Sequence, residues 1–395
     1  LTVTISNLAE VDSSETTLQA SNVVTHLVQG TVVANKTYLP IILKNIGEPG
    51  VPEPPDDLGD VSDVAVDPET NQVFVASPAF DLVYVIDGAS DTVTGQVFVA
   101  NGPTGLAVLD ATDPATNAVF VAHQHGWIPG LKVFDVNEST SRNLQNTDYV
   151  GAAPVKVAAN SSTGRVYVSN YFDKLAVVDG ATETFLGYVE RHTVLGTGPY
   201  GIDVSEATNR VYLATRNAGE LVVFNANILL NSDYVPVNVK PPEKCTLWSV
   251  AVNETTGHVF VPCPQLGKVF VLDEGQLTVQ ALESLAVLEA RDEGSVLVVP
   301  AEVAPWIDTI SDFDGVGLGE EGIAVNTVKD RVFITNASNN TVVVLDDSGS
   351  APVYEMTVGV GDVPQGVDVN EDTQKVYVGN AGSANVTVLS ALSPY

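Results

Sequence analysis

Short apolar stretches separated by polar turns follow one another along most of this chain of 395 residues. Inside the stretches, Val, Ile and aromatic residues alternate with polar residues at a period of two, which is typical of β-strands that bury one face. The 3.6-residue periodicity of amphipathic helices is absent. The pattern therefore predicts an all-β protein.

One of these stretches, a Val followed by an aromatic residue, recurs seven times. The Val positions are Val73, Val119, Val166, Val211, Val259, Val332 and Val376, at intervals of 46, 47, 45, 48, 73 and 44 residues. Each copy has an apolar strand before it and a third strand after it, and most copies have a fourth. Four strands in about 45 residues form the unit of a propeller blade. We predict a seven-bladed β-propeller of four-stranded antiparallel blades.

A tight turn precedes each Val–aromatic strand. Two positions before the Val, the residues are Asn71, Asn117, Gly164, Asn209, Gly257, Asp330 and Gln374. All except Gln374 are of types that tolerate a left-handed backbone, which a tight hairpin turn requires. We therefore expect this turn to join the first two strands of each blade.

The interval of 73 residues leaves about 28 residues beyond an ordinary blade. Within them, the sequence LAVLEARDEGSVLVV has the pattern of a hairpin that turns at RDEG. It is either a hairpin added to blade five or a degenerate eighth blade over residues 285–299. We predict seven blades.

The last copy ends without a fourth strand, so closing the ring needs a strand from elsewhere. Residues 1–45 contain three strand-like segments, LTVTISN, HLVQGTVVAN and KTYLPIILKN. Residues 46–59 form an acidic linker rich in Pro and Gly before the propeller of residues 60–395. GTVVAN is similar to GQVFVAN, the fourth strand of blade one, which favours it as the closing strand. The surplus strands either pack on the chain's own propeller or pair with another copy, which would build a filament.

The strands VYVSN, VFITN and VYVGN, with turns such as DPETN before them and strands such as VIDG after them, resemble the YVTN-type β-propeller repeat family. The resemblance covers roughly residues 60 to 390. It implies a propeller fold and a frequent place on prokaryotic cell surfaces. The strands VFVPCP and VFVAHQH depart from the pattern, because the usual Asn is replaced.

The net charge of the chain limits the classes of partner that it can bind. The 17 Lys and Arg residues against 49 Asp and Glu residues give a formal net charge of −32. This charge repels phosphate backbones and anionic membranes, so we expect no nucleic-acid binding. No apolar run of 18 residues is present, so we expect no membrane span. The chain begins at Leu1 without a visible leader, and we expect either a trimmed chain or a leader removed during export.

Two further features favour export. Seven Asn-x-Ser/Thr acceptor sites for glycans occur, at Asn35, Asn137, Asn160, Asn253, Asn336, Asn339 and Asn385. The only two cysteines, Cys245 and Cys263, flank a predicted hairpin across NETTG that would place the sulfurs nearly opposite each other. They form either a disulfide, which we predict, or two buried thiols, and their spacing excludes a CxxC zinc or redox site.

Motifs that carry chemistry are few. Asp308, Asp312 and Asp314 belong to an acidic, glycine-bearing segment that is either a calcium site or a solvated loop, and we expect no cofactor other than calcium. The pair His123 and His125 lacks an identifiable third metal ligand. Haem-attachment, GxSxG and P-loop motifs are absent.

We therefore expect a non-enzymatic, exported protein of the cell surface, structural or adhesive, whose partners are itself and glycans attached at Asn. A filament assembled through an N-terminal β-strand is part of this hypothesis. The alternative is a lactonase-like propeller enzyme, or a module that binds a small ligand or glycan at the channel mouth. For the enzyme, the candidates are His125, Arg216 and Glu321, in loops that could share a face.

Overall fold

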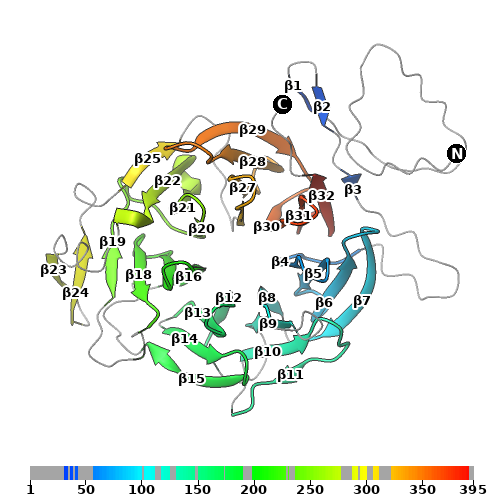
Figure 1. The fold of residues 1–395 in the computed structure, drawn as a ribbon, viewed down its shortest axis with the longest axis horizontal. Helices are drawn as coiled ribbons and strands as arrows, with labels where there is room; N and C mark the ends of the chain where they lie inside the picture. Colours follow the sequence, from blue (N-terminus) through cyan, green and yellow to red (C-terminus); the bar gives the residue numbers. More distant parts are fainter. Residues whose placement is uncertain are drawn as a thin grey trace, which may run out of the picture.

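Seven blades surround a central channel in the computed structural model of the chain (Figure 1). The structure describes residues 57–99, 102–111, 117–124, 130–146, 150–172, 174–189, 198–227, 230, 236–276, 306–310 and 322–390. At 308–309 and in the strands within 31–42 and 287–299, it describes the backbone alone. The predicted all-β fold of seven antiparallel blades is confirmed.

In each blade, three or four strands pair antiparallel and run in chain order from the channel outward, and blades four and seven gain further strands from elsewhere in the chain. Blades one to three consist of β4 (Asp63–Asp67), β5 (Gln72–Ser77), β6 (Leu82–Asp87), β7 (Thr92–Phe98); β8 (Pro103–Leu109), β9 (Ala118–His123), β10 (Gly130–Asp135), β11 (Arg142–Asn143); β12 (Pro154–Asn160), β13 (Arg165–Asn170), β14 (Lys174–Asp179), β15 (Thr184–Val189). Blades four and five contain β16 (Pro199–Ser205), β17 (Arg210–Thr215), β18 (Leu221–Asn225), β19 (Val237–Val239); β20 (Ala251–Asn253), β21 (His258–Cys263), β22 (Lys268–Asp273), β25 (Trp306–Ile310). Blades six and seven contain β26 (Ile323–Asn326), β27 (Arg331–Asn336), β28 (Thr341–Asp346), β29 (Val353–Gly359); β30 (Pro364–Asn370), β31 (Lys375–Asn380), β32 (Asn385–Ser390). Two 3₁₀ turns, η2 (Pro264–Leu266) and η3 (Glu274–Gln276), follow β21 and β22.

The hydrophobic core lies between neighbouring blades. The Val–aromatic strands are the second strands, and their side chains alternate between the two adjacent interfaces. Thus Phe74 of blade one packs against Phe134 of blade two, with 5.7 Å between ring centroids. Val119 and Val121 of blade two belong to the same buried cluster. Each seam between blades therefore contains apolar side chains from both sides.

The repeated turn residue has two functions. Its backbone is left-handed at Asn71, Asn209 and Asp330. Gln374 is also left-handed, with a φ of 58°, although its residue type was the one exception among the predicted turn residues. Its side chain also joins blades: Asn370 of blade seven donates to Asn71 of blade one at 2.9 Å. Corresponding hydrogen bonds link Asn160 with Asn209 at 3.3 Å and Asn326 with Gln374 at 3.1 Å. Side-chain hydrogen bonds between these turns therefore add to the apolar contacts between neighbouring blades.

The long insertion forms a hairpin, β23 (Val287–Arg291) and β24 (Gly294–Val299), as its pattern predicts. The hairpin leaves the chain between β22 and β25 of blade five, but β24 pairs in parallel with β19 of blade four. Blade four thus becomes a six-stranded sheet. Neither expected placement, on blade five or as an eighth blade, is correct, because the open edge of blade four accepts the strand.

The N-terminal segment closes the ring. Strand β3 (Ile41–Ile42) pairs antiparallel with β32, through Ile41 with Val388 and Ile42 with Thr387. The expected closing segment, GTVVAN, instead contributes β1 (Thr31–Val33), which forms a hairpin with β2 (Lys36–Tyr38). Pairing with the next strand in the chain closes a much shorter loop, which costs less entropy.

The predicted disulfide is present. Cys245 and Cys263 are bonded across 5.9 Å between their Cα atoms, and β20 and β21 form the expected hairpin between them. Among the described residues, no helix has the length and hydropathy needed to cross a membrane.

Candidate functional site

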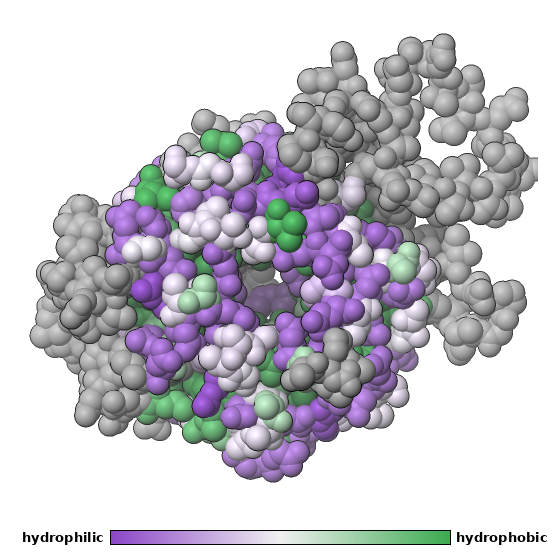
Figure 2. Space-filling view, in the orientation of Figure 1, coloured by the Kyte–Doolittle hydropathy of each residue, from purple (hydrophilic) through white to green (hydrophobic). Residues whose placement is uncertain are grey.

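The inner strands enclose a cavity of about 390 Å³ along the channel. Figure 2 shows the ring hollowed at its centre, with mostly hydrophilic residues around the opening. The wall itself consists largely of small and apolar residues from the first strands of the blades. The cavity is therefore a concave feature in which a site can be sought.

Small residues line the channel because the inner strands converge there. In five blades the inner-strand residue opposite the aromatic of the second strand is Ala, and in two it is Asp: Ala65, Ala107, Ala158, Asp203, Ala251, Ala324 and Asp368. Two residues earlier, four of the seven blades have a glycine that allows direct approach of the next blade: Gly105, Gly201, Gly322 and Gly366. A Cβ on Gly201 would lie 2.4 Å from the Ser249 Cα. Bulkier side chains at these positions would separate the blades.

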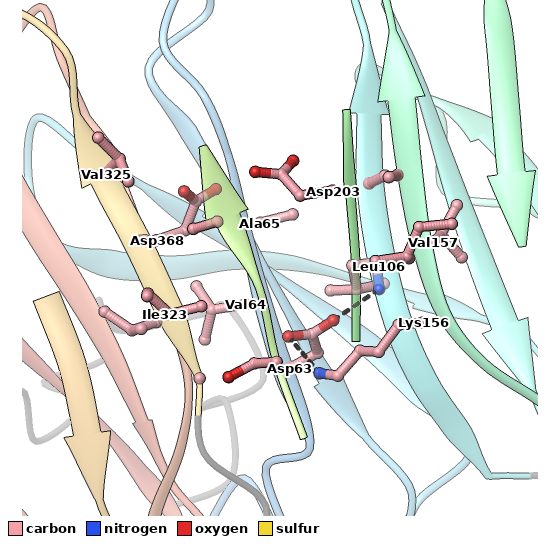
Figure 3. A pocket seen from close by; sticks show the side chains of 18 of the residues that line it. Asp63, Val64, Ala65, Leu106, Lys156, Val157, Asp203, Ile323, Val325 and Asp368 are labelled. Atoms are coloured by element: carbon pink, nitrogen blue, oxygen red, sulfur yellow. Dashed lines mark hydrogen bonds and ion pairs between the residues drawn. The ribbon is translucent and has the colours of Figure 1, made fainter. Parts of the chain in front are cut away.

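A charged pair crosses the channel wall between blades one and three. The Lys156 Nζ lies 2.8 Å from a carboxylate oxygen of Asp63, and both side chains are partly buried (Figure 3). The other Asp63 oxygen accepts the main-chain N–H of Leu106 at 2.9 Å. The ammonium is thus already neutralised by its neighbour and offers little to an anionic ligand.

Two further carboxyl groups face the channel. Asp203 accepts the N–H of Val252 at 2.8 Å, and Asp368 accepts the N–H of Val66 at 2.7 Å. Burial raises the pKa of each carboxyl to about 7, with a smaller contribution from nearby acidic groups. Both retain some accessible surface toward the cavity. They can therefore bind or release a proton near neutral pH, but their shared role is to join adjacent inner strands.

An arginine surrounded by aromatic rings lies beside the channel. The Arg216 Cζ is 3.5 Å from the ring centroid of Trp248, 4.9 Å from that of Tyr200 and 5.4 Å from that of Tyr171. Trp248 also lines the cavity. The structure thus brings rings from blades three, four and five to one guanidinium.

Most of the predicted site residues are not brought together by the described structure. The backbone of Asp308 lies in β25, where it pairs with Val271, while its side chain, Asp312 and Asp314 lie outside the described residues. His125 and Glu321 also lie outside them, so only Arg216 of the enzyme candidates is described. Among the described residues, no group of three His, Cys, Asp or Glu side chains is arranged to hold a metal.

The glycan acceptor sites differ in accessibility. Asn160 and Asn253 are completely buried, and each donates its amide across a blade seam. Asn336 is also buried. The folded chain therefore does not present these three amides, contrary to their inclusion among the expected acceptors. Asn137 and Asn339 are exposed, Asn385 is half-buried, and Asn35 lies outside the described residues.

Comparison with known proteins supports the fold alone. No family model matches the chain, and no curated protein matches it. The chain is similar in structure to hydrazine synthase of Kuenenia stuttgartiensis, with 16% identity, a TM-score of 0.59, and 87% of this chain and 99% of that chain covered. It is also similar to the β-propeller domain of Myceliophteria thermophila Cps50 (Swd1), with 10% identity, a TM-score of 0.59, and 89% and 100% covered.

Proposed function

We propose that the protein is a non-enzymatic, exported structural or adhesive subunit of the cell surface, of the YVTN propeller type, which assembles through its N-terminal β-strands. The net charge of −32 supports a highly hydrated surface outside the reach of nucleic acids. The disulfide supports an oxidising compartment. The hydrogen bonds and apolar contacts between neighbouring blades support a rigid propeller rather than a hinged one.

The observation that carries this proposal is the short pairing that the described residues show along the outer edge of blade seven. Strand β32 has six residues, and its outer edge pairs with β3 at only Val388 and Thr387 in the described structure. By contrast, the outer strand β7 pairs with β6 at six positions. An incompletely paired edge is a template for another strand.

The closing strand also comes from a segment separate in sequence from the propeller that it completes. A segment of this kind can pair with the last blade of its own chain or with that of the next copy, because the hydrogen-bonding partners are identical. Donation to the next copy is head-to-tail and does not close, so it builds a filament. We infer that the N-terminal strands serve this purpose.

Cross-linking across the β3–β32 register tests the proposal. One sample carries Ile41→Cys with one affinity tag, and another carries Val388→Cys with a different tag. After mixing under assembly conditions and adding a short bismaleimide, strand donation predicts a cross-link between the two tagged chains and a ladder for the double variant. Ser90→Cys, in an exposed turn of blade one, replaces Val388→Cys as the control and should give none. Cross-links confined to single chains, with single discs in electron micrographs, would overturn the proposal.

A further inference from the structure

Arg216, which lies among aromatic rings, differs from three other arginines of the chain because it forms no ion pair with a described residue. Arg142, Arg210 and Arg331 each pair with carboxylates of the chain. Arg216 contacts three rings, and its guanidinium makes no hydrogen bond or ion pair with any described residue. Its Nε is buried without a partner. The chain has 49 acidic residues, yet the described structure places none of their carboxylates on this guanidinium, which makes it a candidate site for an anion.

The local fold builds the arrangement from equivalent positions of adjacent blades. Tyr171 and Arg216 each directly follow the second strand of their blade, and their main-chain N–H groups donate to Ala153 and Gly198 at 2.8 and 2.7 Å. Tyr200 and Trp248 each lie eleven residues before the repeat Val of their blade, and their rings contact edge to face at 5.2 Å. The side chains are thus fixed by rigid elements, as a preorganised site requires.

An apolar platform lies next to the cation. Phe172 is 64% exposed, and its ring contacts that of Tyr171 edge to face at 5.4 Å. Trp248 extends the aromatic surface to the cavity wall. A cation beside several aromatic faces fits a ligand that carries a negative charge on a ring with an apolar face.

We propose that Arg216, Trp248, Tyr171 and Phe172 form a binding site for carboxylate-bearing sugars of the uronic acid class. The planar guanidinium fork matches a carboxylate, and the aromatic rings lie beside it to pack against the C–H face of the pyranose. This site uses no residue of the strand-mediated assembly, so the two proposals can fail independently.

Titration with tri-galacturonate, followed by calorimetry, tests the site, and the methyl ester of the same trisaccharide is the matched neutral probe. The wild-type protein should bind the acid at least tenfold more tightly than the ester, and Arg216→Gln should lose about 10- to 100-fold in affinity for the acid. Arg216→Lys keeps the charge without the fork and should retain part of the affinity. Arg165→Gln, a half-buried arginine of blade three, removes the same charge elsewhere and should bind normally.

A second variant guards against a folding defect at Arg216. Phe172→Ser changes a largely exposed ring, so the melting temperature should stay unchanged while affinity for the acid falls several-fold. Equal binding of acid and ester, unchanged binding by Arg216→Gln, or no binding of the acid at about 10 mM would each overturn the site. Tighter binding of a Glu-rich peptide than of the trisaccharide would overturn the assignment to sugars.

Discussion

Asp368, in the inner strand of the last blade, accepts a 2.7 Å hydrogen bond from the main-chain N–H of Val66 in the first blade. The two residues lie 302 positions apart, so this bond crosses the seam where the ring closes. Asp203 joins blade four to blade five in the same way, through Val252. Carboxyl groups in the channel thus act as connections between blades, and their titration is coupled to the stability of the ring.

Stability is expected to fall as pH rises from about 4 to 7 through these two carboxyls. Burial raises the pKa of Asp203 and Asp368 to about 7, so the folded protein retains protons that the unfolded chain has already released in this range. Each group then lowers the free energy of unfolding by at most ~1.4 kcal/mol per pH unit. Urea unfolding between pH 4.5 and 8 measures the effect. The free energy of unfolding of the double variant Asp203→Asn/Asp368→Asn should depend less on pH than that of the wild type. If the two free energies differ by the same amount at every pH in this range, the expectation is contradicted.

Gly366→Ala should destabilise the closing seam. A Cβ there would lie 2.6 Å from the Asp63 Cα and the Val64 nitrogen of blade one, and backbone atoms cannot move aside cheaply. We expect a loss of about 1–3 kcal/mol or more, measured by urea unfolding. Gly95→Ala, in the outer strand of blade one, is the control, because its nearest neighbour would be 3.8 Å away. A similar loss in both variants would show that chain entropy and not close approach decides the effect.

Asp347→Ala should be among the most destabilising single changes. Its carboxylate is completely buried and bonds to Asn253, Thr256 and His258 at 2.8, 2.6 and 2.5 Å. Removal takes the acceptor away from the buried His258 and the half-buried Thr256 and leaves Asn253 only its longer hydrogen bond to Asp330, and we expect a loss of about 3–5 kcal/mol in unfolding free energy. Glu243→Ala breaks the exposed ion pair with Lys268 and should lose less than about 1 kcal/mol. Comparable effects would exclude burial as the cause.

Expression in a host that attaches N-glycans should modify the acceptor sites selectively. Asn137 and Asn339 are exposed, so we expect glycans there. Asn160 and Asn253 are buried donors at blade seams, and folded, secreted protein should carry none at these positions. Peptide mass spectrometry after enzymatic deglycosylation in heavy-oxygen water identifies the occupied sites. Occupancy at Asn160 in monodisperse folded protein would contradict the burial argument.

The blade repeat was predictable because each blade repeats the same local pattern. Val73 and its counterparts mark the second strands, and the turn residues before them mark the hairpins. The pairing of Cys245 with Cys263 was also predictable, because both flank a single hairpin. These features depend on neighbours in sequence, which periodicity and turn chemistry report directly.

Features that depend on distant partners were not predictable in the same way. The hairpin at 287–299 was recognisable, but its attachment to β19 of blade four depends on an open edge whose residues precede their partners in β24 by 60 positions. Ile41 and Ile42, not GTVVAN, pair with β32 for the same kind of reason. The cluster at Arg216 gave no motif, because its members come from three blades. Only an alignment of the repeats could have indicated the cluster, because it shows that Tyr171 and Arg216 occupy equivalent positions of their blades, as do Tyr200 and Trp248.

The pairing of β3 with β32 also sets a time order for biosynthesis. Ile42 and its partner Thr387 are separated by 345 residues, so β3 is made early and meets its partner only after nearly the whole propeller has left the ribosome. Until then β3 has no native partner within its own chain, and under the proposed strand donation its partner would be β32 of an older copy. The order of synthesis thus gives an emerging chain the opportunity to engage an older molecule before it can complete itself.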